Sequence, residues 1–131
     1  MSEAKKELAR FIIAGCSAVA TDTLVYFIFL NFLSPSPSKA ISFIAGTIVA
    51  FLINKYWTFK QPKHSWKEII KFSILYATTL GVNVSVNHLT LFILPGALII
   101  AFLAATGTST VLNFIGQKWW VFGPKGNDQA I

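Results

Sequence analysis

Charged residues are scarce in this sequence: they make up 12% of its 131 residues, about half of the roughly 25% found in an average soluble domain. A chain this short has a large surface for its volume, so a water-soluble domain would need more polar side chains to cover it. Hydrophobic residues make up 54% and aromatic residues 15%, which excludes a disordered chain. The composition therefore predicts a small integral membrane protein.

Features that many soluble proteins and enzymes carry are also absent. Cys16 is the single cysteine, so no disulfide within the chain is possible. No group of His, Cys and Asp has the spacing of metal ligands, and no glycine-rich loop is suited to a phosphate. Asp22 is the one acid within a long hydrophobic run, so no pair of carboxylates is available for catalysis. We therefore expect neither an enzyme activity nor a cofactor.

The formal net charge of +6 does not point to nucleic acid. A nucleic-acid-binding domain carries its cations as a patch on a soluble body, whereas here they stand at a few points between long apolar runs. Such a distribution sets the orientation of a membrane protein. We expect the lipid bilayer, and no nucleic acid, as a partner.

Four hydrophobic stretches are long enough to cross a bilayer, which takes about 20 mostly apolar residues. They cover residues 11–33, 40–57, 69–94 and 97–121, and residues 72–117 contain no Asp, Glu, Lys or Arg. The Pro- and Ser-rich residues 34–38 and the pair Pro95-Gly96 separate them, because proline cannot continue a helix interior. The sequence predicts an all-α membrane protein with four transmembrane helices in one domain, residues 1–131.

The cations fall on one side of these predicted spans. Of the 11 Lys and Arg residues, only Lys39 lies in the connection between the first two helices. The others are at the N-terminus, in the central loop or at the C-terminal end: Lys5, Lys6, Arg10, Lys55, Lys60, Lys63, Lys67, Lys71, Lys118 and Lys125. By the positive-inside rule, both termini and the central loop are predicted to be cytoplasmic.

The sequence also repeats. The motif Lys-aromatic-Trp-x-Phe occurs at residues 55–59 and again at 118–122, an offset of 63, and residues 10–33 match 71–94 at an offset of 61. A two-helix unit repeated once keeps its direction, so residues 10–59 and 71–122 are predicted to form two parallel-repeat helical hairpins. Transporter sites often lie at the interface of such repeats. Duplication for packing alone remains open.

The residues that carry the repeat also carry a family resemblance. Arg10-Phe11 and Asp22 in the first helix, the ending Asn54 to Phe59, and the ending Lys118 to Phe122 resemble the GtrA-like family of small four-helix membrane proteins. One departure is Tyr76, at the position that would repeat Gly15. The resemblance implies translocation of a polyprenyl-phosphate-linked sugar across the bacterial cytoplasmic membrane. It implies that outward-facing membrane glycosyltransferases then use that sugar on a cell-surface polymer.

Each predicted helix has one cation at its expected cytoplasmic end: Arg10, Lys55, Lys71 and Lys118. Cations that converge there would hold the phosphate of such a substrate through charge-assisted hydrogen bonds. The competing interpretation is that each is an anchoring residue at the membrane boundary.

Asp22 lies twelve residues beyond Arg10, roughly 18 Å deeper along a helix. Ionisable groups near mid-membrane are costly and often mark a transport pathway or a proton relay. Asn83 is the repeat counterpart of Asp22, and Asn87 lies one helical turn further on. We expect these three residues to contact the polar sugar, with hydrogen bonding between helices as the alternative. The neighbouring His88 is expected to play no part in the site.

Two other functions stay open at this point. One is a small proton-coupled multidrug-type exporter, although such proteins that insert in both orientations would show little cation bias. The other is a subunit that anchors a glycosyltransferase in the membrane without transporting anything. Four helices are too few to enclose a sugar phosphate, so a homo-oligomer, a dimer, is expected.

Overall fold

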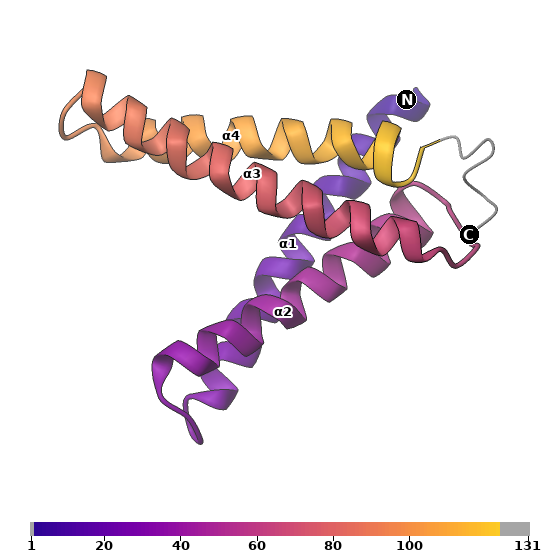
Figure 1. Ribbon diagram of the computed structural model, residues 1–131, viewed down its shortest axis with the longest axis horizontal. Coiled ribbons are helices and arrows are strands. Elements are labelled where there is room, and N and C mark those ends of the chain that lie inside the picture. Colours follow the sequence, from indigo (N-terminus) through magenta and orange to yellow (C-terminus); the bar gives the residue numbers. More distant parts are fainter. Residues whose placement is uncertain (1, 124–131) are drawn as a thin grey trace. The chain divides into compact units, whose positions relative to one another are not determined.

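The computed structural model describes residues 2–123, which divide between two compact units, Met1–Lys63 and His64–Ile131. In the first unit, α1 (Glu3–Phe29) packs along α2 (Pro35–Ile53); in the second, α3 (Trp66–Ile93) packs along α4 (Leu98–Gly116) (Figure 1). A π-helical turn ends each hairpin: η1 (Asn54–Thr58) after α2 and η2 (Gln117–Val121) after α4. All four helices are long and apolar enough to cross a membrane, which confirms the predicted all-α membrane protein.

Three of the four helices begin earlier than the hydrophobic runs indicate, whereas α4 begins one residue later, at Leu98. α1 starts at Glu3, because the Ser2 hydroxyl accepts a hydrogen bond from the Lys5 N–H (3.3 Å) and caps the helix. α2 starts at Pro35 instead of residue 40, since the fixed φ and missing N–H of proline suit a first helical turn. α3 starts at Trp66, three residues before the predicted start. The residues between Phe29 and Pro35 therefore form a shorter connection than the sequence indicates.

Within the first unit, α2 contacts α1 through a small residue at every fourth position. Ser38, Ser42, Gly46 and Ala50 are all buried. A Cβ atom on Gly46 would lie 2.8 Å from the carbonyl oxygen of Ala18, closer than real contacts allow. Small side chains let helix backbones approach closely, which matters in lipid because the hydrophobic effect does not drive helices together there. Gly46 is therefore the point of closest approach in this hairpin.

The second unit uses the same four-residue spacing with more polar contacts. Ala101 and Ala105 are buried on α4, and the next two positions are Ser109 and Asn113. The Thr79 hydroxyl donates to Asn113 Oδ1 (2.8 Å), and Asn83 Nδ2 donates to Ser109 Oγ (3.0 Å). At these positions side-chain hydrogen bonds join α3 to α4, whereas at the matching positions of the first unit close backbone packing joins α1 to α2.

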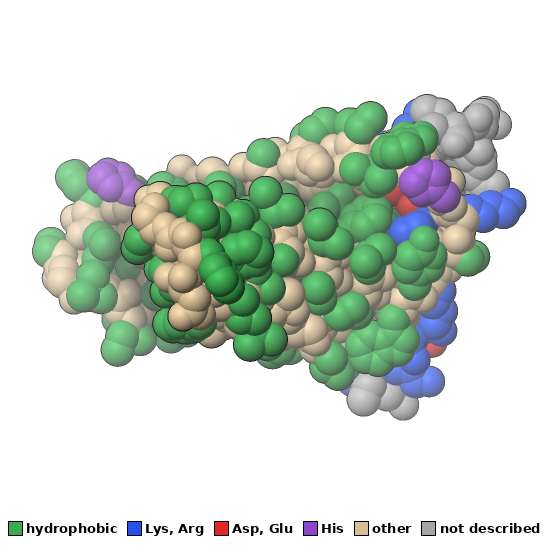
Figure 2. Space-filling model, turned by 90° about the horizontal axis from the view of Figure 1, so that it is seen from below, with side chains coloured by type: hydrophobic (Ala, Val, Ile, Leu, Met, Phe, Trp, Pro, Cys, Tyr) green, Lys and Arg blue, Asp and Glu red, His purple; other side chains and the backbone are tan. Residues whose placement is uncertain are grey.

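The outward faces of the helices are apolar. Large hydrophobic side chains are exposed along each of them, including Leu24 at 64%, Leu80 at 59% and Ile99 at 76%. The face drawn in Figure 2 accordingly shows many hydrophobic side chains. Exposed apolar area of this extent would be a liability in water, and it is the surface that a membrane-spanning helix presents to lipid.

A substitution at Gly46 tests the close approach. Gly46→Ala should lower the free energy of unfolding by about 1–3 kcal/mol, because the new methyl group meets the rigid backbone of Ala18. Gly15→Ala is the matched control: it lies in α1 of the same unit with no atom within 4 Å of the new Cβ. That variant should be neutral or slightly stabilising. Reversible unfolding in mixed detergent micelles measures both, and equal losses would contradict this account of the hairpin.

Candidate functional site

The two π-helical turns place aromatic and cationic side chains at the end of each hairpin. In η1 the Phe59 N–H donates to the Asn54 carbonyl (2.8 Å), and in η2 the Phe122 N–H donates to the Gln117 carbonyl, also 2.8 Å. This five-residue spacing widens the last turn, a distortion that is frequent at functional sites. Phe59 then packs on Phe11, with ring centroids 6.4 Å apart. The wider turn thus fixes the end of α2 against α1.

Arg10 lies against Trp57 in the first unit. Its guanidinium carbon is 5.3 Å from the centre of the indole ring, and Nη1 donates to the Trp57 carbonyl oxygen (3.4 Å). The carbonyl groups in the last turn of a helix lack a helical donor, and Pro62, five residues further on, has no N–H to offer. A guanidinium has five N–H donors. Arg10 can therefore hold the end of η1 and still donate to an anion.

The second unit repeats this contact. Lys71 Nζ is 5.7 Å from the centre of the Trp120 ring and donates to the Trp120 carbonyl oxygen (3.5 Å). Phe72 packs on Phe122 with ring centroids 6.5 Å apart, as Phe11 packs on Phe59. Both hairpins thus pair a cation on their first helix with a tryptophan of their π-helical turn.

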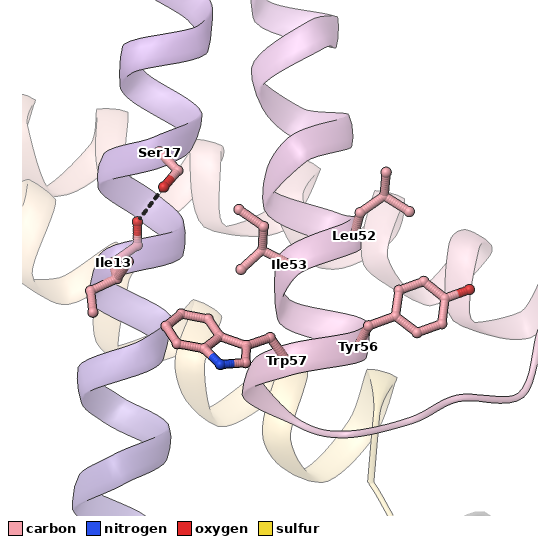
Figure 3. A pocket seen from close by; sticks show the side chains of 6 residues that line it. All are labelled: Ile13, Ser17, Leu52, Ile53, Tyr56 and Trp57. Atoms are coloured by element: carbon pink, nitrogen blue, oxygen red, sulfur yellow. Dashed lines mark hydrogen bonds between the residues drawn. The ribbon is translucent and has the colours of Figure 1, made fainter.

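An open groove of about 390 Å³ lies beside the Arg10–Trp57 contact in the first unit. Its lining is mostly apolar: Ile13, Ser17, Leu52, Ile53, Tyr56 and Trp57 (Figure 3). Trp57 extends toward Ile13 on α1 (Figure 3). The Ser17 hydroxyl donates to the Ile13 carbonyl (2.9 Å), so the polar group in the lining is already hydrogen-bonded within α1. The groove therefore offers an apolar surface, and one of its lining residues, Trp57, carries the Arg10 guanidinium over its ring.

Lys55 and Lys118, the other two predicted phosphate contacts, have different surroundings. Lys55 is only 2% exposed; its ammonium donates to the Lys63 carbonyl and lies 5.2 Å from the Tyr56 ring centre. Lys118 lies 4.8 Å from the Trp119 ring centre. Arg10 and Lys55 thus each lie against an aromatic residue that lines the groove, and phosphate contacts by Arg10, Lys55 and Lys118 stay predictions. Lys125, which contributed to the predicted orientation, lies outside the described residues.

Asp22 has a partner that sequence analysis missed. Lys39 Nζ lies 2.9 Å from both carboxylate oxygens of Asp22, and 5.9 Å from the centre of the Tyr26 ring. The connection between Phe29 and Pro35 turns α2 back along α1, which brings Lys39, four residues into α2, to Asp22, seven residues before the end of α1. The opposite charges on the two sides of this short connection were the signal available in the sequence.

Asn83 and Asn87 occupy the second unit. Asn83 bonds to Ser109 across the hairpin, as described above, and Asn87 lies one turn further along α3, partly exposed. His88 is exposed on the neighbouring face. The hydrogen bond of Asn83 agrees with the packing role that was the alternative, and a contact of Asn83 or Asn87 with a sugar stays a prediction.

These features define a small multi-pass membrane protein whose helical hairpins each end in a cation–tryptophan contact. Residues 10–122 match the family described as GtrA/DPMS, transmembrane domain. The chain is also similar to the uncharacterized membrane protein YngA of Bacillus subtilis (strain 168). That similarity is 32% identity over 128 residues, covering 94% of this chain and 84% of the relative. The chain belongs to the GtrA/DPMS transmembrane-domain family.

The contact between Arg10 and Trp57 is expected to contribute to stability. A double-mutant cycle with Arg10→Gln and Trp57→Leu should give a coupling free energy of about 0.5–2 kcal/mol, because a cation over an indole ring and a hydrogen bond are lost together. The exposed Lys6, paired with Trp57 in a second cycle through Lys6→Gln, should show no coupling. Unfolding in detergent measures the free energy of unfolding for both cycles. If the losses caused by Arg10→Gln and Trp57→Leu are additive, the contact contributes nothing to stability.

Proposed function

We propose that this chain translocates a polyprenyl-phosphate-linked monosaccharide from the cytoplasmic to the outer leaflet of a bacterial cytoplasmic membrane, for glycosylation of a cell-surface polysaccharide. Membership of the GtrA/DPMS family supports a role in the translocation of sugars on glycosyl carrier lipids. The identity of the substrate and its movement between the leaflets are proposed from the site described above. No bond is made or broken, and the chain acts as a carrier and not as an enzyme.

The observation that carries this proposal is the apolar groove lined by Trp57, together with the Arg10 guanidinium that lies over the Trp57 ring. A polyprenyl-phosphate sugar joins a long apolar tail to an anionic phosphodiester. The groove along Ile13, Leu52 and Ile53 suits the first isoprene units. Arg10, held over Trp57, has further N–H donors for the phosphate oxygens. A multidrug cation would meet a like charge at Arg10, so this site favours an anionic amphiphile.

The sugar needs polar partners inside the membrane. Asp22 in the first unit and Asn83 and Asn87 in the second are the polar groups that we assign to it, because amide and carboxylate groups hydrogen-bond sugar hydroxyls. We assign further phosphate contacts to Lys71, Lys55 and Lys118. We also propose that a membrane glycosyltransferase consumes the translocated sugar, and that the chain works as a homodimer, which would supply more helices around the substrate.

Translocation in proteoliposomes tests the proposal. The full chain should move polyprenyl-phosphate-linked glucose, mannose or galactose between leaflets, measured as accessibility of the sugar to an external oxidant. Arg10→Gln should lower the rate at limiting substrate more than at saturation, because it weakens phosphate capture. The exposed Lys6→Gln is the matched control and should leave the rate unchanged.

Two results would contradict this. If no sugar lipid moves above the rate in empty liposomes, with or without an added glycosyltransferase, the chain is not a translocator. If Arg10→Gln and Lys6→Gln behave alike, Arg10 is only an anchoring residue.

The proposed direction of transport requires both termini to be cytoplasmic. In a Cys16→Ser background, Ser34→Cys lies in the connection between α1 and α2, and His64→Cys lies in the loop before α3. On intact cells, a membrane-impermeant maleimide should label the first and reach the second only after permeabilisation, because the cations of the central loop favour the cytoplasm. The reverse labelling pattern would overturn the orientation.

A further inference from the structure

The ion pair between Asp22 and Lys39 lies at the opposite end of the first hairpin from Arg10. α1 runs from Glu3 to Phe29, with Arg10 in its first half and Asp22 in its second, and Lys39 follows four residues after the start of α2. The carboxylate is bound through both oxygens at 2.9 Å, yet the Lys39 side chain remains 60% exposed and that of Asp22 21%. The ammonium is therefore accessible from outside the hairpin while its charge is balanced from within.

The hairpin geometry does not require this pair. At the repeat offsets, the counterparts of Asp22 and Lys39 in the second unit are Asn83 and Phe102, which carry no charge. That unit still forms the same kind of hairpin, with Asn83 bonded to Ser109. Two charges in a bilayer are costly unless they are paired. A pair that the fold can do without, in the unit that also holds the groove and Arg10, points to a role beyond packing.

We propose that Lys39 is a second anion site of this chain, at which the phosphodiester of a carrier lipid displaces the Asp22 carboxylate while Asp22 takes up one proton from water. This inference rests on the proposed function, because it supplies the anion site at the far end of the hairpin that a translocated phosphate would need. When no substrate is bound, the Asp22 carboxylate binds the Lys39 ammonium, and it therefore competes with the phosphodiester for Lys39.

Charge balance determines the proton step. In the free chain one carboxylate and one ammonium give a neutral site. A phosphodiester brings one negative charge, so the occupied site becomes neutral only if the carboxylate is converted to a carboxylic acid. A low-dielectric surrounding penalises net charge strongly, and so it couples anion binding to protonation. When the anion leaves, Asp22 releases its proton and binds Lys39 again.

The groups that face this site are few in the first unit. On α1 the Tyr26 ring lies near the Lys39 ammonium, 5.9 Å from Nζ to the ring centre, and on α2 the ammonium itself faces Asp22. The Ser42 hydroxyl donates to the Lys39 carbonyl (3.0 Å) and also lies within hydrogen-bonding reach of the Asp22 carboxylate, so it faces the same site. Within the described part of this hairpin, Asp22 is the acid that the hydrogen bonds and ring contacts place at Lys39, so the proton is assigned to it.

Calorimetric titration in two buffers tests the proposal. Citronellyl-phosphate-linked glucose is titrated into the full chain in phosphatidylcholine nanodiscs, in PIPES and in imidazole, whose ionisation enthalpies differ, so that the protons taken up are counted. The wild-type chain should take up a proton on binding, and its affinity at this site should rise about tenfold for each pH unit lowered. Asp22→Asn should bind at least tenfold more tightly at neutral pH, without proton uptake.

Variants of Lys39 separate the site from Arg10. Lys39→Gln should abolish the proton uptake and leave the weaker binding that depends on Arg10, whereas Lys39→Arg should retain both. Asp22→Asn leaves the Lys39 ammonium without its partner in the membrane, so the double variant Asp22→Asn/Lys39→Gln guards against misfolding by providing an uncharged pair, as the second unit has. Unchanged proton uptake in this double variant would overturn the proposal.

The remaining outcomes are distinct. Binding that is lost in Arg10→Gln but is the same in all Asp22 and Lys39 variants overturns this inference and leaves the proposed function standing. Absence of any binding to the wild-type chain overturns the proposed function itself. Dimethyl phosphate, a phosphodiester that does not titrate near neutral pH, should cause no proton uptake, since it has no apolar tail to hold it in the bilayer beside Lys39. If phosphatidylglycerol causes the same uptake as the sugar lipid, the site takes bulk lipid phosphates and the assignment to a carrier lipid is wrong.

Discussion

Close backbone contact between the two helices of the first hairpin is the constraint on which its other features depend. At Gly46 there is no space for a Cβ against the Ala18 carbonyl, and this contact holds α1 and α2 at a short separation in lipid, where no hydrophobic effect drives them together. At that separation a lysine near the start of α2 reaches the carboxylate of Asp22. Toward the other end, the same approach brings Phe59 onto Phe11 and Arg10 onto Trp57. One small residue thus positions both charged ends of the hairpin.

The π-helical turns extend this reasoning to the ends of both hairpins. A regular α-helix would rotate each residue after Asn54 by about 100°; the wider turn changes that rotation, and Phe59 lies buried while Trp57 is half exposed beside the groove. The same contacts recur around η2 with Phe122 and Trp120. The Trp ring and carbonyl together orient a cation in each hairpin, and this is the geometry on which the proposed phosphate contact rests.

The fold was largely predictable, because twenty apolar residues in a row leave few alternatives in a bilayer. The four spans and the family follow from hydropathy and from the recurring Lys-aromatic-Trp-x-Phe motif. The helix starts were harder to predict. Proline both ends helices and occurs in their first turn, and Pro35, which the sequence analysis placed in a connection, begins α2. For the site, sequence analysis singled out Asp22 and Arg10 but treated Lys39 only as a topology residue. A contact between residues seventeen apart depends on where the connection lies: the sequence analysis placed Lys39 in it, whereas the structure ends α1 at Phe29 and begins α2 at Pro35, so that Lys39 lies within α2.

The difference between the two hairpins is more informative than their similarity. Both have a cation on a tryptophan at the π-helical end, so a phosphate arriving there meets similar chemistry in either unit. At the other end the first hairpin has a charge pair and the second has a hydrogen bond between Asn83 and Ser109. An uncharged amide can hydrogen-bond a sugar but cannot neutralise the negative charge of a phosphate. The Lys39 ammonium can neutralise that charge only if the Asp22 carboxylate leaves it. In the function that we propose, this divergence gives the charge pair of the first half a task in neutralising the phosphate that the uncharged second half does not share.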